Sequence, residues 1–261
     1  MGQAFLGLRN NGGSVNLCIR SVKPAHPPFI TDPAPRSAAA SPAPIQSQRT
    51  VRVWDLPTRL FHWALLACVV ALFVTAYAPG NWIEWHARVG YLVMTLLLFR
   101  IVWGVIGGHW SRFASFLPGR GYRAGHSVAG ALAVVVMLGV LGAQVATGLI
   151  SDDQIAFTGP LNRFVSNDQG LAASAWHTGP GQWLLVGLIA LHVAAIAFYV
   201  VVRRQRLVRA MIAGDKELPA GISLEAEGVI VATRDTAASR ALALAVFVLC
   251  AGLVYVVVTA A

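Results

Sequence analysis

The chain of 261 residues is 56% hydrophobic and only 12% charged, a composition that excludes a water-soluble globular protein. Its formal net charge of +9 would suit a nucleic-acid-binding protein, but the Lys and Arg residues flank the apolar segments instead of lining a soluble face, so we expect no nucleic-acid partner. The remaining class is an integral membrane protein. We predict an all-α helical bundle, because open sheets cannot satisfy their backbone groups in lipid.

Residues 1–50 are rich in Ala, Pro, Ser and Gly and have no periodic apolar face. Such a segment cannot build a core, so we predict a disordered N-terminal tail. It also lacks the continuous apolar stretch of a signal peptide, which favours a cytoplasmic tail. An overextended start codon is the alternative interpretation.

Five segments have close to the ~20 apolar residues that cross ~30 Å of hydrocarbon. They are residues 60–79, 86–107, 127–150, 181–202 and 239–259. The basic residues gather before the first segment, between the second and third, and after the fourth. The positive-inside rule therefore predicts a cytoplasmic N-terminus and, with five spans, a periplasmic C-terminus.

These segments divide the chain into parts. We predict a four-helix transmembrane domain over residues 51–215, a cytoplasmic linker over 216–238 and a structural C-terminal transmembrane helix over 239–261. The basic stretch at residues 203–219 is typical of a short amphipathic segment on the membrane surface.

The first span begins in the sequence VRVWDLPTRLFHW. Asp55 can cap a helix and Pro57 suits a first helical turn, so we predict a helix that starts near Leu56. His62 then lies within about two turns of the cytoplasmic surface. Taken alone, it is either an interfacial histidine beside an anchoring Trp63 or a metal ligand.

The second span has His86 in its first, outer turn, and Gly90 lies one turn further on. A glycine at this position lets a flat macrocycle approach the backbone. Arg100 lies in the cytoplasmic half of the span. There it either snorkels to the surface or meets a carboxylate.

The loop between the second and third spans contains His109 and His126, for which we predict solvated interfacial positions. His126 lies at the mouth of the third span, where a hydrogen bond to a cofactor propionate is an alternative. The third span has no histidine. Its polar residues Gln144 and Thr147 are expected to bond to neighbouring helices.

The fourth span contains two histidines, His177 at its start and His192 in its middle. Because four helical turns take about 14.4 residues, the spacing of 15 residues predicts that both project from one face, roughly 22 Å apart. Thr178 is a predicted helix cap, and the glycines and proline after it leave the backbone free to adjust. A histidine inside a membrane indicates a functional site.

The topology places the four histidines at two depths. His62 and His192 lie in the inner half of the membrane, and His86 and His177 lie at its outer end. Two imidazoles from two helices are what a bis-histidine haem b requires, with axial nitrogens about 4 Å apart. Zinc fits less well, since its sites need three or four protein ligands. Chance placement of polar residues at packed interfaces remains the alternative.

The residues also resemble a known family. The segments that show the resemblance are RVWDLPTRLFHW, then WHARVGY with FRIVWGVIGG, then GHSVAGAL with TGL, and finally WH with ALH followed by RLVRAMIAG. Over about residues 50–215 the chain resembles bacterial cytochrome b561, most closely the di-haem b-type cytochrome subunits of membrane-bound nickel-iron hydrogenases. The long leader and the fifth helix depart from the minimal four-helix form.

The resemblance implies an inner haem b held by His62 and His192 and an outer haem b held by His86 and His177. The spacing between His177 and His192 is one residue longer than is usual in the family, and the TGPG sequence offers a place to absorb the extra residue. For the propionates of the inner haem, the candidate partners are Arg59 and Arg100, since a guanidinium can form paired hydrogen bonds with a carboxylate.

We therefore expect an electron carrier of the bacterial cytoplasmic membrane. It would connect an outer-side redox partner, either a hydrogenase-like subunit or a cytochrome c, with the membrane quinone pool through two b haems. Such a chain is more readily an electron-transfer subunit than a stand-alone enzyme. Two alternatives stay open: a free-standing quinol oxidase that acts on a small acceptor such as superoxide, and a haem-free transporter or scaffold.

Overall fold

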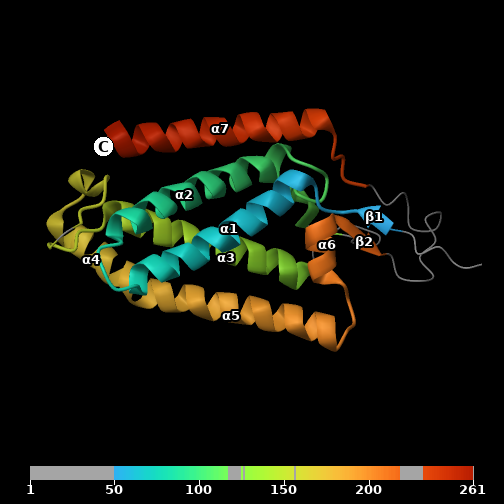
Figure 1. Ribbon diagram of the computed structural model, residues 1–261, viewed down its shortest axis with the longest axis horizontal. Coiled ribbons are helices and arrows are strands. Elements are labelled where there is room, and N and C mark those ends of the chain that lie inside the picture. Colours follow the sequence, from blue (N-terminus) through green and yellow to red (C-terminus); the bar gives the residue numbers. More distant parts are fainter. Residues whose placement is uncertain (1–49, 117–124, 126, 156, 218–231, 261) are drawn as a thin grey trace, which may run out of the picture. The chain divides into compact units, whose positions relative to one another are not determined.

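The structure is a computed structural model, and it describes residues 50–116, 125, 127–155, 157–217 and 232–260. Most of the predicted tail, His126 and the middle of the predicted linker therefore lie outside the described residues. Within the unit from Ser47 to Ala261, helices dominate (Figure 1).

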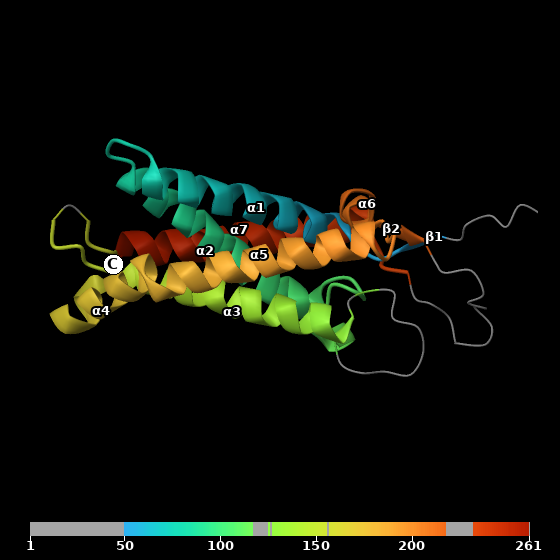
Figure 2. The same cartoon turned by 90° about the horizontal axis from the view of Figure 1, so that it is seen from below.

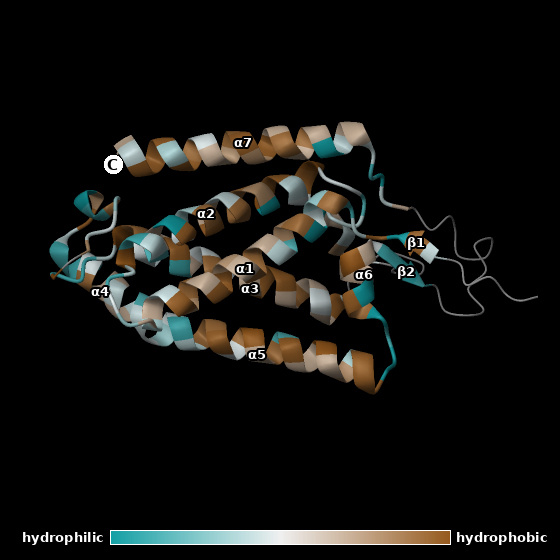
Figure 3. Ribbon diagram, in the orientation of Figure 1, coloured by the Kyte–Doolittle hydropathy of each residue, from teal (hydrophilic) through white to brown (hydrophobic). Residues whose placement is uncertain are grey.

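Five helical spans are long and apolar enough to cross a membrane, which confirms the predicted membrane bundle. They are α1 (Leu56–Tyr77), α2 (Ile83–Ile106), α3 (Val128–Ile150), the pair α4 (Asn167–Thr178) and α5 (Pro180–Val201), and α7 (Ala237–Ala260). Apolar residues dominate α5 and α7 (Figure 3), and many of them are exposed, such as Leu191 at 67% and Leu249 at 73%. Lipid is the environment that suits such surfaces.

Helix α2 is the centre of the packing, since it contacts α1, α3 and α7, while α3 also contacts α4 and α5. In Figure 1, α7 and α5 lie on opposite sides of α1, α2 and α3, and in Figure 2, seen from below, α5 lies in front of α7 and between α1 and α3. Phe99 and Trp103 of α2 stack at 5.8 Å between ring centroids in the core. Among the described helices, α1 and α5 do not form a closely packed pair.

Helix α1 begins where the sequence predicts. Asp55 is its N-cap, and its Oδ1 atom accepts a hydrogen bond of 3.0 Å from the amide of Thr58. Pro57 lies in the first turn, where its missing N–H costs nothing. The cap and the proline together confirm the predicted start at Leu56.

The fourth predicted helix is in fact two helices that meet at Gly179. The sequence predicted only that the backbone after Thr178 is free to adjust. It predicted neither a break in the helix nor α4 as a separate helix. Its sequence signal is the capping box of Ser166 and Gln169, in which each side chain bonds the backbone of the other. The predicted cap at Thr178 was wrong, because Thr178 is the last residue of α4 and its hydroxyl donates to the carbonyl of Ser174 at 2.9 Å.

The prediction that His177 and His192 share one helical face rested on a continuous helix. The backbone of Gly179, with φ −114° and ψ −110°, is not helical, so the two histidines belong to separate helices. A side chain at Gly179 would place its Cβ 2.7 Å from the carbonyl oxygen of Ala175, which explains why glycine occupies the break. The break lies in the TGPG sequence that we expected to absorb the extra residue.

A small sheet closes the end of the unit at which α1 begins. Strands β1 (Thr50–Arg52) and β2 (Asp215–Glu217) pair antiparallel, and α6 (Leu207–Ala213) leads into β2 through Gly214, whose φ of 92° favours glycine. The sheet was not predicted, because three-residue strands have no periodicity to detect. Two 3₁₀ turns, η1 (Phe113–Phe116) and η2 (Asn162–Phe164), complete the elements.

The segment before α7 joins this sheet through Asp235. The carboxylate bonds Arg52 at 3.0 Å and Arg240 at 2.8 Å and lies 3.9 Å from Arg59. The hydrogen bond from Arg240 is the main cause that holds the pKa of Asp235 below its ordinary value, and Arg52 acts in the same direction against the effect of burial. This ion-pair cluster fixes the start of α7 to the start of α1.

Candidate functional site

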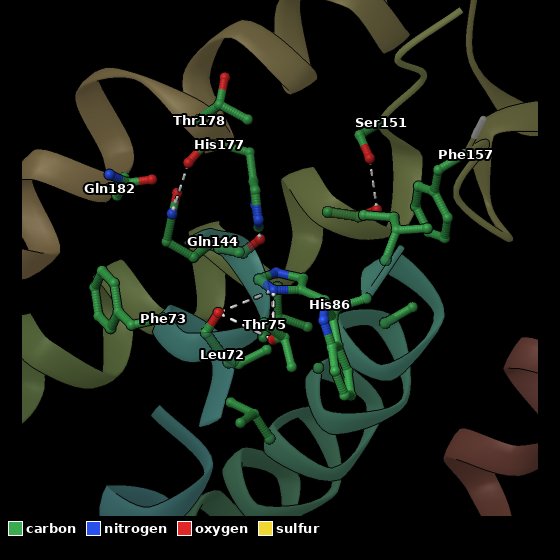
Figure 4. A pocket seen from close by; sticks show the side chains of 18 of the residues that line it. Leu72, Phe73, Thr75, His86, Gln144, Ser151, Phe157, His177, Thr178 and Gln182 are labelled. Atoms are coloured by element: carbon green, nitrogen blue, oxygen red, sulfur yellow. Dashed lines mark hydrogen bonds between the residues drawn. The ribbon is translucent and has the colours of Figure 1, made fainter. Parts of the chain in front are cut away.

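Two of the four predicted histidines face each other at the end of the bundle where α2 begins. His86 lies in the first turn of α2 and His177 in the last turn of α4. Their ring centroids are 6.1 Å apart and the ring planes are nearly perpendicular, at 80°. Figure 4 shows both imidazoles among the side chains that line one cavity. The structure thus brings together the pair that the sequence placed at the outer depth.

Hydrogen bonds fix the protonation of both rings. Nδ1 of His86 lies 3.1 Å from the carbonyl oxygen of Leu72, and Nδ1 of His177 lies 2.8 Å from that of Gln144. A carbonyl only accepts, so each Nδ1 must carry the proton and each Nε2 keeps a free lone pair. This is the state of a metal-binding histidine, which commonly donates its second N–H to a carbonyl.

The cavity beside these rings has a volume of about 430 Å³, within the ~300–1,000 Å³ typical of ligand sites. Its walls come from α1 to α5, the connection between α1 and α2 and the loop after α3, and most of them are apolar. Gly90 lines it, and a Cβ built on Gly90 would meet nothing within 4 Å. A Cβ on Gly148, by contrast, would lie 3.1 Å from the ring of His177. A flat group can therefore approach the backbone at Gly90, one turn from His86, while the absence of a side chain at Gly148 makes room for the ring of His177 itself.

We predict that Gly90→Leu sharply lowers haem content, because the new side chain would fill the open space at the cavity wall. Gly252→Leu is the matched control. Gly252, on α7, is likewise open within 4 Å but does not line the cavity. The pyridine haemochrome content of the two purified variants is the measurement. Equal haem content in both would show that Gly90 is not needed for cofactor access.

The other predicted pair, His62 on α1 and His192 on α5, lies deeper in the bundle. Both residues are half-buried. Nδ1 of His62 is buried and has no hydrogen-bond partner among the residues that the structure describes. A buried polar atom without a partner is costly. The ring is therefore available to a bound group between two helices that do not pack closely.

The two candidate arginines have protein partners. Arg100 is buried, donates to the carbonyl of Ser111 at 3.0 Å and lies over the ring of Phe113, so it does not snorkel to the surface. Arg59 donates to the carbonyl of Ile212, while its Nε is buried without a partner in the described part of the chain. Of the two, Arg59 keeps unused donor capacity.

The predicted interfacial histidine His109 is half-buried rather than fully solvated. It packs edge-on against Trp110 at 4.8 Å between ring centroids and contacts Arg112. Burial first, and then the charge of Arg112, lowers the pKa of His109. His109 thus belongs to the loop and takes no part in either pair. His126 lies outside the described residues.

The donor set of the described residues favours two-ligand sites. No group of three or more His, Cys, Asp or Glu side chains comes together in the described ranges in a way that would hold a metal ion. A structural or catalytic zinc site would need such a group. A pair of histidines beside a cavity, such as His86 and His177, fits a macrocycle, which would supply the remaining ligands of its iron.

Three contacts of the outer pair were not predicted from the sequence. Thr75 and Thr147 place their hydroxyl oxygens 3.2 Å and 3.3 Å from Nδ1 of His86 and His177. The side chain of Gln144 donates to the backbone carbonyl of His177 at 3.0 Å. The sequence predicted that Gln144 and Thr147 bond to a neighbouring helix, which they do, but not that His177 is the partner. Nothing in the sequence distinguished them from ordinary helix-packing residues.

An apolar bundle of five spans, with two histidines from different helices facing each other beside a ligand-sized cavity, fits a membrane-bound metalloporphyrin protein. The family model for prokaryotic cytochrome b561 matches residues 53–214, more than half of the chain, and the chain belongs to that family. The resemblance noted in the sequence is therefore confirmed. Membership makes the protein a multi-pass membrane cytochrome that carries electrons by means of haem b.

Three curated relatives are described as probable Ni/Fe-hydrogenase B-type cytochrome subunits. The protein from Azotobacter chroococcum mcd 1 is 26% identical over 223 residues, which cover 65% of this chain and 90% of the relative. The protein from Bradyrhizobium diazoefficiens is 28% identical over 33% of this chain and 42% of the relative. The protein from Azotobacter vinelandii is 28% identical over 28% of this chain and 38% of the relative. No solved structure matches the chain significantly.

Proposed function

We propose that this protein carries electrons across the bacterial cytoplasmic membrane through two bis-histidine b haems. The outer haem is held by His86 and His177 and the inner haem by His62 and His192. The observation that carries the proposal is the outer pair. Its rings lie 6.1 Å apart, each Nδ1 is bound to a carbonyl and a cavity of about 430 Å³ lies beside them.

The protein's own residues perform three tasks in this proposal. The carbonyls of Leu72 and Gln144 keep Nε2 of each outer histidine unprotonated and aimed at the cofactor. The apolar walls of the cavity exclude water, which limits the polarity around the iron. The haem itself, when bound, supplies the reversible one-electron chemistry.

We propose the inner pair by analogy of position. His62 and His192 come from helices that do not pack closely, and the buried Nδ1 of His62 has no partner in the described ranges. We assign Arg59 as the partner of an inner propionate, because its buried Nε has a donor to spare. Arg100 is a weaker candidate, since Ser111 and Phe113 already engage its guanidinium, and His126 is kept only as a sequence-based candidate.

The redox partners follow from the relatives and from the topology. The relatives are described as hydrogenase cytochrome subunits, so we propose a hydrogenase-like subunit as the outer-side partner, with a cytochrome c as the other possibility. The membrane quinone pool is the proposed partner at the other end. We propose a cytoplasmic N-terminus and a periplasmic C-terminus, because the positive-inside rule favours the cytoplasmic side for the basic residues at the end where α1 begins.

The haem-to-protein ratio tests this proposal. We expect about two haems b per chain of purified protein, and a reduced-minus-oxidised spectrum with a b-type band that titrates in two steps. A spectrum without that band would contradict the proposal and favour a haem-free scaffold. One haem per chain would contradict the proposed inner site and support only the outer site. Oxidation of quinol by the purified protein without any partner would favour a free-standing oxidase instead.

A further inference from the structure

The two outer histidines are held by the same local structure on two different helices. On α1 the carbonyl of Leu72 and the hydroxyl of Thr75, three residues later, both face Nδ1 of His86. On α3 the carbonyl of Gln144 and the hydroxyl of Thr147, again three residues later, both face Nδ1 of His177. The repetition on unrelated helices points to a function of the threonines beyond packing.

The hydrogen of each threonine hydroxyl is committed to its own helix. The Thr75 hydroxyl donates to the carbonyls of Ala71 at 2.8 Å and Leu72 at 3.1 Å. The Thr147 hydroxyl donates in the same way to Ala143 at 2.8 Å and Gln144 at 3.0 Å. Such back-bonding to the preceding turn is common for threonine in helices. It leaves only oxygen lone pairs to face the imidazole.

Each histidine N–H is therefore shared between two acceptors. For His86 the acceptors are a carbonyl at 3.1 Å and a hydroxyl at 3.2 Å, and for His177 they are at 2.8 Å and 3.3 Å. A stronger pull on the Nδ1 proton raises the electron density and basicity of the ring. An electron-rich axial ligand favours the oxidised iron, and hydrogen bonding outside the ligands is a known determinant of haem potential.

We propose that Thr75 and Thr147 are a matched pair of positioning residues that lower the reduction potential of the outer haem. The inference rests on the proposed function, because it requires a haem between His86 and His177. The inner site lacks the arrangement on at least one side, since Nδ1 of His62 has no hydrogen-bond partner in the described part of the chain. The threonines thus give the two haems different potentials.

The test is redox potentiometry on the purified holoprotein with valine in place of each threonine. Valine keeps the shape of the side chain and removes the acceptor oxygen. Thr75→Val and Thr147→Val should each shift the outer midpoint potential upward, and the double variant should shift it further. The inner potential and the content of two haems should stay unchanged. Thr75→Ser and Thr147→Ser keep the hydroxyl and should restore the original potential.

Thr95→Val is the matched control. Thr95 is also buried, and its hydroxyl donates to the carbonyl of Tyr91 one turn back at 3.0 Å, but it faces no histidine. An outer potential that is unchanged in the double variant, or that shifts equally in Thr95→Val, would overturn the inference. If the valine variants lose the outer haem, the serine variants decide: retention at the original potential supports the role, and loss overturns it.

The failure of the proposed function would look different. In that case the unmodified protein would bind fewer than two haems, or His86→Ala would retain both. A normal haem content with unresponsive potentials would instead remove only the role of the threonines.

Discussion

Purified His86→Ala and His177→Ala proteins are expected to contain about half the haem of the unmodified chain. Each substitution would remove one of the two proposed ligands of the outer haem, and among the described residues the cavity has no further histidine to replace it. His62→Ala and His192→Ala should likewise lose about half, from the inner site. Haem content together with potentiometry distinguishes the two sites, because each variant should keep only one of the two redox transitions.

His109→Ala provides the control for these variants. His109 is half-buried against Trp110 in the loop and belongs to neither pair, so its substitution should leave both haems in place. The proposed pairing would be untenable if all five variants lost haem equally. It would also be untenable if His86→Ala and His192→Ala lost the same redox transition, because that would pair histidines at different depths.

Asp55→Ala should strongly destabilise the end of the unit at which α1 begins, opposite the end that holds His86 and His177. Its side chain is fully buried. One carboxylate oxygen caps α1, and the other accepts from the Trp103 indole at 3.1 Å, the Gly108 amide at 3.2 Å and the Ser111 hydroxyl at 3.1 Å. Alanine would leave four donors without an acceptor, at ~1–3 kcal/mol each if they remain dry. Allowing for water entry, we expect a loss of roughly 3–5 kcal/mol.

Thermal unfolding of the purified protein in detergent measures this effect, and a loss of that size lowers the midpoint by roughly 10 °C. Asp55→Asn should also destabilise, because every partner of Asp55 is a donor and the amide NH₂ would have to face one of them. Asp168→Asn is the control: Asp168 is exposed in the first turn of α4, and its substitution should cost at most about 0.5 kcal/mol. Equal stability of Asp55→Ala and Asp168→Asn would contradict the role of Asp55.

Hydropathy and charge were sufficient to predict the five spans, because a bilayer imposes the length and the apolarity of a helix from outside. The start of α1 was equally predictable, since Asp55 and Pro57 act locally. The depth of His86 and His177 followed from the same topology. Local sequence signals and the length that the membrane imposes were therefore enough to predict most of the helices and to choose the site residues.

The contacts that support the outer site could not be predicted in this way. Thr75 and Thr147 reach the histidines only because of how consecutive helices, α1 with α2 and α3 with α4, pack against each other, and threonine is common in helix interfaces. The separation of α4 from α5 depends on the backbone conformation of Gly179. Glycine can adopt many backbone conformations, so the sequence alone does not predict which one it takes. Tertiary packing decided these features.

The ion pair between Arg52 and Asp235 joins positions 183 residues apart, so it can form only late in folding. A contact of such separation must wait until the intervening chain is synthesised and its helices are inserted, because loop closure has to precede it. Before that moment Arg52 already has a carboxylate partner in Asp215, at 2.9 Å. The start of α1 can therefore be organised by β2 first, and α7 is expected to lock last onto a bundle that is already assembled.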